Sequence, residues 1–193
     1  MPMGLSALGI NLARCPEVKS RSGVLLIVGS GRCVWDDLDK VLSNDGNYYR
    51  VGPDVMCLND MVMHFPGKVD HVYSNDEKEL PKWIEARRPR ALKDFPHAIL
   101  QHTCQKGKGN QIVWPWPGHG TSGLNAVYTG LALGYDEIIL AGIPMDGSGH
   151  YFDPPWKETN YIPMGRYWKM AAEKVFDGKV KSLSGQTKEI IDG

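Results

Sequence analysis

The chain alternates between short, strongly apolar runs and longer stretches in which apolar residues recur at helical spacing. The clearest run, 23–28, has no polar position, which is typical of a strand covered on both faces. Further short strands are predicted at 54–58, 69–73, 98–102, 137–142 and 180–183. Helices are predicted at 35–42, 78–90, 121–133 and 164–176 and at the C-terminal end, with a short helical turn at 61–65. This alternation predicts an α/β fold: a single open, doubly wound, Rossmann-like and mostly parallel sheet with helices on both faces.

The predicted elements belong to one domain that follows a short leading segment. A length of 193 residues suits a single domain of ordinary size. Residues 1–22 are interpreted as a flexible or loosely docked N-terminal lead-in, and residues 23–193 as the Rossmann-like, nucleotide-binding domain. Within that domain, residues 143–163 are rich in Gly and Pro and are interpreted as a lid-like loop.

Composition and charge remove several classes of function. The 22 basic residues balance the 22 acidic ones, so the chain lacks the electrostatic field by which proteins bind extended nucleic acid. No apolar stretch is long enough to predict a membrane span. The four cysteines are far apart and form no CxxC pair, which disfavours a zinc site and favours reduced thiols. We therefore expect a cytoplasmic protein without a metal centre.

Small polar residues follow several of the predicted strands. They are Ser30, Asn59, Ser74 and Asn75, and the segment 142–144 follows another strand. In doubly wound sheets, ligands bind in the crevice outside the carboxyl ends of the strands. These residues are therefore predicted to form the floor of a binding pocket.

Two glycine-containing turns are candidates for anion binding. Gly29 and Gly31 would let the backbone approach a phosphate, although they also suit a plain tight turn and the GxGxxG pattern is incomplete. Residues 121–123 open a predicted helix, where Ser or Thr is first of all an N-cap. The free N–H groups of such a helix start can also hold an anion, so the two uses are compatible.

Residues 146–153 combine glycines with reactive side chains. Asp146 and His150 bring a carboxylate and an imidazole, as in an active-site lid, although a plain surface loop can have the same composition. Other loop residues could either meet a ligand or serve the structure alone. They are Trp114, Trp116, His119, Lys106 and Lys108.

Three segments together resemble the bacterial CMP-sialic acid-dependent sialyltransferases: the strand followed by 29–31, the strand that ends in Asn59, and the stretch 121–143. They equally resemble a related family described as 6-hydroxymethylpterin diphosphokinase-like (MptE-like). The resemblance covers residues 23–153, and its most specific part is TSG, helix, LGYDEI, strand and GI at 121–143. Small single-domain versions of this fold are often phage-encoded, so a phage origin is an expectation.

The resemblance implies where a nucleotide would be held. Together with the turns described above, the implied nucleotide-binding set is Gly29, Ser30, Gly31, Asn59, Ser74, Asn75, Thr121, Ser122, Gly123 and Tyr151. Ser74 and its neighbour Asn75 are alternatives for one family position. In the family, aromatic hydroxyls after the GI strand clasp the phosphate, and here the candidates are Tyr151 and, farther along the chain, Tyr161.

Two family features are missing, and both bear on the chemistry. The family's GID acid is replaced by Pro144, and its general-base histidine lies beyond the lid, where this chain has no histidine after His150. If the chain is a transferase, His150 or Asp146 must take the catalytic acid–base role, or the chemistry differs. No DxD motif for a metal–diphosphate clamp ends a strand, which favours metal-independent chemistry with no required cofactor.

The leading hypothesis is a nucleotide-binding protein resembling sialyltransferases: a metal-independent glycosyltransferase that uses a nucleotide sugar, with a CMP-type donor favoured and the acceptor undetermined. One alternative is a pyrophosphokinase-like transferase that uses ATP and Mg²⁺. Another is a catalytically silent nucleotide-binding or sequestering protein. The expected partner is the small-molecule donor, and a homo-oligomer is compatible with the sequence.

Overall fold

The strands of the protein form one parallel sheet. The computed structural model describes residues 5–6, 9–41, 52–91, 99–107, 109–117, 121–158 and 161–193. Within these residues the sheet has seven strands in the order β5-β4-β3-β2-β1-β6-β7, and every neighbouring pair is parallel. The strands are β1 (Val24–Val28), β2 (Asp54–Leu58), β3 (His71–Tyr73), β4 (Leu100–Thr103), β5 (Ile112–Val113), β6 (Glu137–Ala141) and β7 (Val180–Ser182).

Helices cover both faces of this sheet. They are α1 (Val34–Val41), α2 (Met61–His64), α3 (Leu80–Ala91), α4 (Ser122–Leu133), α5 (Gly165–Ala171) and α6 (Gly185–Asp192), with the short turns η2 (Leu12–Arg14), η3 (Ile162–Met164) and the π-helical η4 (Ala172–Phe176). Leu25 and Ile27 of β1 belong to the buried cluster that includes residues of α4 and α5. Leu26 and Val28 belong to the cluster that includes residues of α1, α2 and α3. The strand is thus buried on both faces, as its unbroken apolar run predicted.

This arrangement confirms the predicted doubly wound α/β fold. The predicted strand at 54–58 has the observed bounds, and the described ends of the others differ by at most two residues. Strand β5 was missed because two residues are too few to show a pattern, and the predicted helix 164–176 is divided into α5 and η4. Position 42 of a predicted helix and position 98 of a predicted strand lie outside the described residues.

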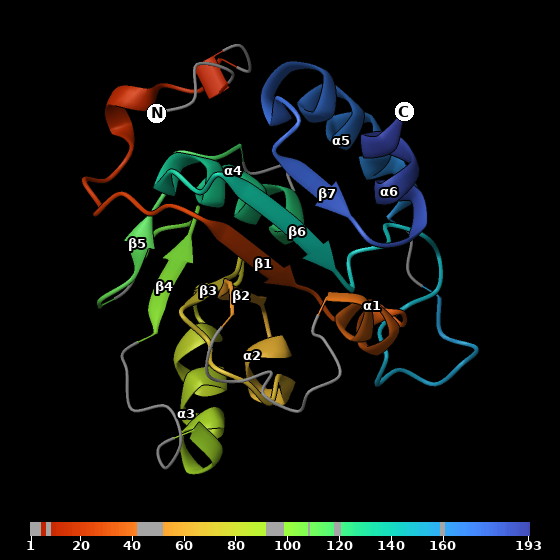
Figure 1. Ribbon diagram of the computed structural model, residues 1–193. Helices are drawn as coiled ribbons and strands as arrows, with labels where there is room; N and C mark the ends of the chain where they lie inside the picture. Colours follow the sequence, from red (N-terminus) through yellow and green to blue (C-terminus); the bar gives the residue numbers. More distant parts are fainter. Residues whose placement is uncertain are drawn as a thin grey trace.

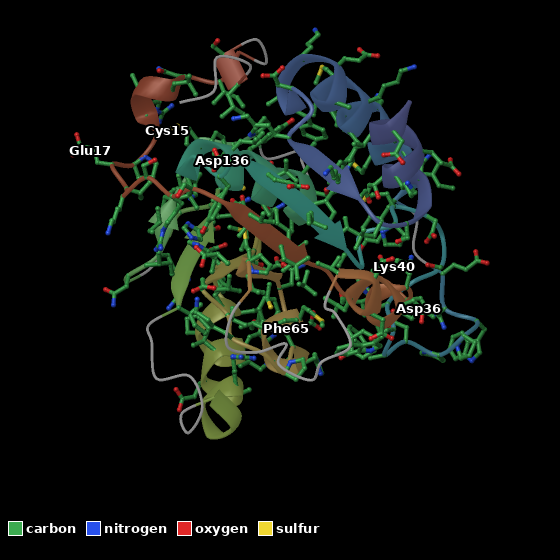
Figure 2. All side chains as sticks on the ribbon, in the orientation of Figure 1. Cys15, Glu17, Asp36, Lys40, Phe65 and Asp136 are labelled. Atoms are coloured by element: carbon green, nitrogen blue, oxygen red, sulfur yellow. The ribbon has the colours of Figure 1, made fainter. Side chains whose placement is uncertain are left out.

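The strand order reverses between β1 and β6. Strands β2 to β5 lie on one side of β1, and β6 and β7 lie on the other. The arrows of β1, β6 and β7 point towards α1 and the loop that follows β6 (Figure 1). Asp136 lies near the starts of β1 and β6, where its carboxylate accepts the N–H of Gly23 at 2.7 Å, and Lys40 lies on α1 (Figure 2). The crevice at such a reversal is where doubly wound sheets bind ligands.

The described part of the leading segment lies against the core. Leu5 and Ile10 are buried in the same cluster as α4, and the N–H of Arg21 donates to the carbonyl of Leu133 at 2.7 Å. These residues are therefore docked on the domain and contribute to its core. The sequence left a flexible or a loosely docked lead-in open, and the burial of these two apolar side chains agrees with docking.

Hydrogen bonds link five side chains in the core at β3 and β4, and we call this set the buried histidine chain. The indole N–H of Trp114 donates to His102 Nδ1 at 3.0 Å. His102 Nε2 therefore carries the hydrogen that meets His71 Nδ1 at 3.0 Å. His71 Nε2 donates to the Tyr135 hydroxyl at 2.9 Å, which donates to Asp54 at 2.6 Å. Burial lowers the pKa of His71 to about 4 and that of His102 well below its usual value, so both rings are neutral.

Two tryptophans that could have served a ligand instead pack inside the protein. The rings of Trp114 and Trp116 are stacked, with centroids 5.3 Å apart and planes at 9°. Trp116 also donates its indole N–H to Thr129 at 2.8 Å. With 1% and 4% of their surface exposed, neither ring is open to a base or a sugar. Packing is therefore the correct one of their two interpretations.

Candidate functional site

A cavity opens at the point where the strand order reverses. Its volume is about 180 Å³, many times the space that one water molecule needs. The turns after β1, β2 and β6, the first turn of α4 and Tyr161 contribute to its lining. Of the residues singled out in the sequence, the cavity brings together Gly29, Ser30, Gly31, Asn59, Thr121, Ser122, Gly123, Asp146 and His150.

The turns after β1 and β6 touch each other through their backbones. A Cβ on Gly29 would lie 2.6 Å from the carbonyl oxygen of Gly142, and one on Gly31 would lie 2.4 Å from the Pro144 ring. Gly142 itself has a φ of 66°, and its Cβ would lie 2.7 Å from Val34. Contact between the two turns accounts for these glycines, in agreement with the tight turn that was one of their two interpretations. A phosphate contact at Gly29 and Gly31, which both line the cavity, stays a prediction.

A fully buried carboxylate on α1 supports the turn after β6. Asp37 Oδ2 accepts the N–H of Gly142 at 3.0 Å and the hydroxyl of Ser184 at 2.6 Å. The sequence analysis missed this residue as part of the site. The signal was available, because Asp37 shares the buried stripe of its helix with Val34 and Leu38, where an apolar residue is expected.

Ser30 and His150 form the central pair of the cavity. The Ser30 hydroxyl lies 2.7 Å from His150 Nδ1. Their backbones are also joined, because the N–H of Tyr151 donates to the carbonyl of Ser30 at 2.9 Å. A hydroxyl can accept from Nδ1–H or donate to a bare Nδ1, so the bond holds in either neutral tautomer of the ring. The pair can therefore take up a proton at Nε2 in one tautomer and release it in the other.

The loop that carries His150 is fastened to the turn after β1. Arg32 donates from Nε to the carbonyl of Ser148 at 2.6 Å and from a terminal nitrogen to that of Pro154 at 3.2 Å. Within the loop, Asp153 accepts the N–H of His150 at 3.3 Å. The described part of the lid-like loop is thus held beside the cavity in this structure, and a lid motion stays a prediction.

Asp146 lines the cavity, but one of its oxygens already serves the loop. Oδ1 accepts both the N–H and the hydroxyl of Ser148, at 2.9 and 2.5 Å. This pattern is that of an aspartate that shapes a turn. Each acid–base candidate thus has one polar side-chain atom engaged, Oδ1 of Asp146 by Ser148 and Nδ1 of His150 by Ser30.

Asn59 follows β2 with a left-handed backbone, at a φ of 51°. Asn tolerates this conformation better than most residues do. Ser74 is buried behind it and donates its hydroxyl to Asn59 Oδ1 at 2.7 Å. That bond fixes the amide, so its NH₂ group is what Asn59 can offer to a ligand. Ser74 is not among the lining residues and acts on the cavity through Asn59.

The first turn of α4 forms another wall. Thr121 is its N-cap, and the Thr121 hydroxyl accepts an N–H of the first turn at 3.2 Å, as expected. The first bond within the helix runs from Asn125 N–H to the Thr121 carbonyl at 3.0 Å. The N–H groups of Ser122 and Gly123 therefore have no partner inside the helix. Asn75 lies one step back, where its N–H donates to the Ser122 hydroxyl at 3.4 Å.

The two candidate tyrosines lie in different places. Tyr161 lines the cavity, whereas Tyr151 does not. The ring of Tyr151 makes edge contacts with Trp35 and His64, with centroids 5.4 and 5.7 Å apart. Of the two candidates, the one that lines the cavity is therefore Tyr161, which the sequence placed second.

Some sequence candidates fall elsewhere, and some lining residues were not foreseen. His119 and Lys108 lie outside the described residues, and Lys106 is exposed and not part of the cavity lining. Leu58 and Met145 line the cavity but had no signal of their own, because apolar residues at strand ends are also ordinary core.

Metal-binding clusters and membrane-spanning helices are both absent from the described residues. Across these ranges, no group of three or more His, Cys, Asp or Glu side chains is arranged to hold a metal ion. In the same part of the chain, no helix has the length and apolar character to cross a membrane.

Comparison with known proteins gives a likeness in structure. No protein-family model matches the chain, and neither does any curated protein. Among solved structures, the sialyltransferase CstII from Campylobacter jejuni in complex with the substrate analogue CMP-3FNeuAc has a TM-score of 0.49 and 13% identity, over 84% of this chain and 80% of that one. The same sialyltransferase in complex with cytidine-5'-monophosphate has a TM-score of 0.46 and 14% identity, over 83% and 79%. The proposals below rest on this chain's own residues.

Proposed function

We propose that this protein binds a nucleotide sugar in the cavity and acts as a glycosyltransferase that requires no metal ion. The observation that carries the proposal is the convergence of hydroxyl and amide groups from the turns after β1 and β2 and the start of α4 on one cavity that also holds an imidazole. Such a set binds phosphate and ribose through hydrogen bonds. It needs no excess of cationic side chains, in agreement with the zero net charge.

The donor would be held from three sides. The free N–H groups at the start of α4 and the Ser122 hydroxyl would meet the phosphate, because a helix N-terminus favours an anion. Asn59 and Ser30 would hold the sugar of the nucleotide through their amide and hydroxyl groups. Asn75 would act through its bond to Ser122. The hydroxyl of Tyr161 would clasp the phosphate, and a CMP-type donor is favoured.

His150 would supply the acid–base chemistry. With Nδ1 on Ser30, Nε2 accepts the proton of the acceptor hydroxyl as the acceptor oxygen bonds to the anomeric carbon of the donor sugar. The bond from that carbon to the phosphate oxygen breaks, and its electron pair leaves with the nucleotide. The N-terminus of α4 stabilises the charge on the departing phosphate.

Calorimetric titration with CMP, UDP and GDP and with their sugars tests this proposal. We expect the CMP series to bind most tightly and EDTA to leave the affinity unchanged. Ser122→Ala should weaken binding about tenfold, because it removes a hydrogen bond to a charged group. Ser20→Ala, an exposed serine outside the cavity, is the matched control and should change nothing.

The same titration, extended to ATP with and without Mg²⁺ and paired with an assay for release of nucleotide, separates the alternatives. No response to any nucleotide would overturn the proposal. Binding of ATP only in the presence of Mg²⁺ would favour the pyrophosphokinase reaction. Nucleotide binding with no release of nucleotide from its sugar, across a panel of acceptors, would favour a silent binding protein.

A further inference from the structure

Phe152 lies in an unusual place for a large apolar ring. Its side chain is 46% exposed, so burial alone does not explain its position. Its ring is stacked on that of His150, with centroids 5.3 Å apart and planes at 7°. It is also stacked on that of His64, with centroids 5.8 Å apart and planes at 25°. Phe152 thus contacts one histidine of the cavity and one histidine outside it.

We propose that Phe152 is a positioning residue that fixes the ring plane of His150. The single side-chain hydrogen bond with Ser30 restrains Nδ1, but changes of χ1 and χ2 together can still tilt the imidazole plane while Nδ1 stays near Ser30. Contact between two ring faces restricts this tilt, because it sets the plane of one ring by the plane of the other. Together the two contacts determine where Nε2 points. The inference rests on the proposed function in so far as His150 is the acid–base group.

The residue that packs behind Phe152 is His64 of α2, whereas Ser30 belongs to the turn after β1. His64 ends α2, the helix that follows the turn with Asn59, so the stack links the loop after β6 to the cavity wall after β2. His64 is held in turn by an edge contact with Tyr151, with centroids 5.7 Å apart and planes at 86°. Tyr161 also makes an edge contact with the His150 ring, with centroids 6.5 Å apart and planes at 77°, but the parallel contact comes from the row of rings anchored on α2.

The substitution Phe152→Leu removes the aromatic face and keeps much of the apolar volume. We expect the His150 ring, once free to tilt, to lose part of its bond to Ser30, so that the NOEs from its ring protons to Ser30 weaken and its ¹⁵N resonances move towards the values of a solvent-exposed imidazole. Phe152→Tyr keeps the face and should keep the wild-type resonances. Trp156→Ala is the matched control, because this aromatic residue lies in the same loop, is 80% exposed and is not part of the cavity lining. It should leave the His150 ring unaffected.

The catalytic consequence is measured separately, as release of nucleotide from its sugar on transfer. For Phe152→Leu we expect kcat to fall about tenfold to a hundredfold, the range for a misplaced catalytic group, with the nucleotide Kd unchanged. Phe152→Tyr should restore kcat. A parallel loss of kcat and affinity would indicate general damage to the loop and overturn the inference.

The ring resonances test the positioning role of Phe152, and nucleotide binding and release test the proposed function, so either can be contradicted without the other. If the wild-type protein neither binds nor turns over a nucleotide, the proposed function is wrong, and the ring resonances alone decide the role of Phe152. If Phe152→Leu leaves those resonances in place, the positioning role is wrong whatever the activity. Should Phe152→Leu not fold, His64→Ala removes the support behind Phe152, and an unchanged His150 ring in that variant would equally overturn the inference.

Discussion

Histidines occupy two regions of this protein and are partnered differently in each. In the buried histidine chain, both ring nitrogens of His71 have partners and the side chain is fully buried. In the cavity, His150 has Nδ1 on Ser30, no hydrogen bond is found for its Nε2 among the described residues, and the residue lines a space that a ligand can enter. A ring bound at both nitrogens holds its protons, whereas a ring with one open nitrogen can exchange them. The same residue type therefore serves stability in one region and chemistry in the other.

The exposure of the imidazole to solvent distinguishes these two roles. Burial lowers the pKa of His71 to about 4, because the charged imidazolium loses its hydration there. His71 is therefore neutral at physiological pH, and its partners require it to be so. The lesson is that the environment of both nitrogens must be known before a histidine is assigned to catalysis.

The largest expected loss of stability comes from removing His71 from the buried histidine chain. His71→Ala should lower the free energy of unfolding by about 4 kcal/mol, because it leaves a cavity in the core and two buried partners without their hydrogen bonds. His150→Ala should cost less than about 1 kcal/mol, because water in the cavity replaces its contacts. Urea unfolding of the two variants measures the difference, and equal losses would contradict the comparison.

A second effect is a loss of stability in acid. The pKa of His71 is about 4 in the folded protein against 6.5 for an ordinary histidine, so the unfolded chain takes up the proton first as the pH falls. The contribution of His71 is thus present above pH 6.5 and is lost between pH 6.5 and 4, about 3 kcal/mol in all. Urea unfolding at a series of pH values measures this slope. It should be shallower in His71→Gln, and an unchanged slope would mean that other groups cause it.

A third, smaller effect concerns Tyr135, which links His71 to Asp54 at one end of the buried histidine chain. The Tyr135 hydroxyl accepts from His71 and donates to Asp54. Tyr135→Phe should therefore lower the free energy of unfolding by about 2 kcal/mol, because it leaves a buried imidazole N–H without an acceptor. The midpoint of thermal unfolding, compared with that of the wild-type protein, measures this loss. Tyr167→Phe is the control: its hydroxyl accepts an exposed bond from Arg166 at 2.8 Å, which water can replace, so the midpoint should shift much less.

The sequence predicted the scaffold better than the contacts within the site. The unbroken run of β1 and the cap and glycine around α4 gave the strands, the helices and the crevice, because burial and helix ends leave local signals. Of the polar residues predicted at strand ends, Ser30 and Asn59 line one cavity, whereas Ser74 and Asn75 do not. Local sequence patterns do not show which side chains contact one another when they are far apart in the sequence. The position of Ser74 behind Asn59 and the stacking of Phe152 on His150 both arise from segments far apart in the chain.

The smallest expected change in stability sharpens the comparison most. Ser30→Ala makes the same kind of change as Tyr135→Phe, since each removes one hydroxyl from beside an imidazole. In the cavity, water can take the place of the Ser30 hydroxyl at His150 Nδ1, so the free energy of unfolding should fall by less than about 1 kcal/mol. The proton equilibrium of the ring should respond instead, and the ¹⁵N shifts of His150 should report a changed tautomer ratio. If Ser30→Ala costs as much stability as Tyr135→Phe and leaves the tautomers alone, the pair in the cavity is a structural contact like the buried one, and the acid–base role of His150 would have to be abandoned.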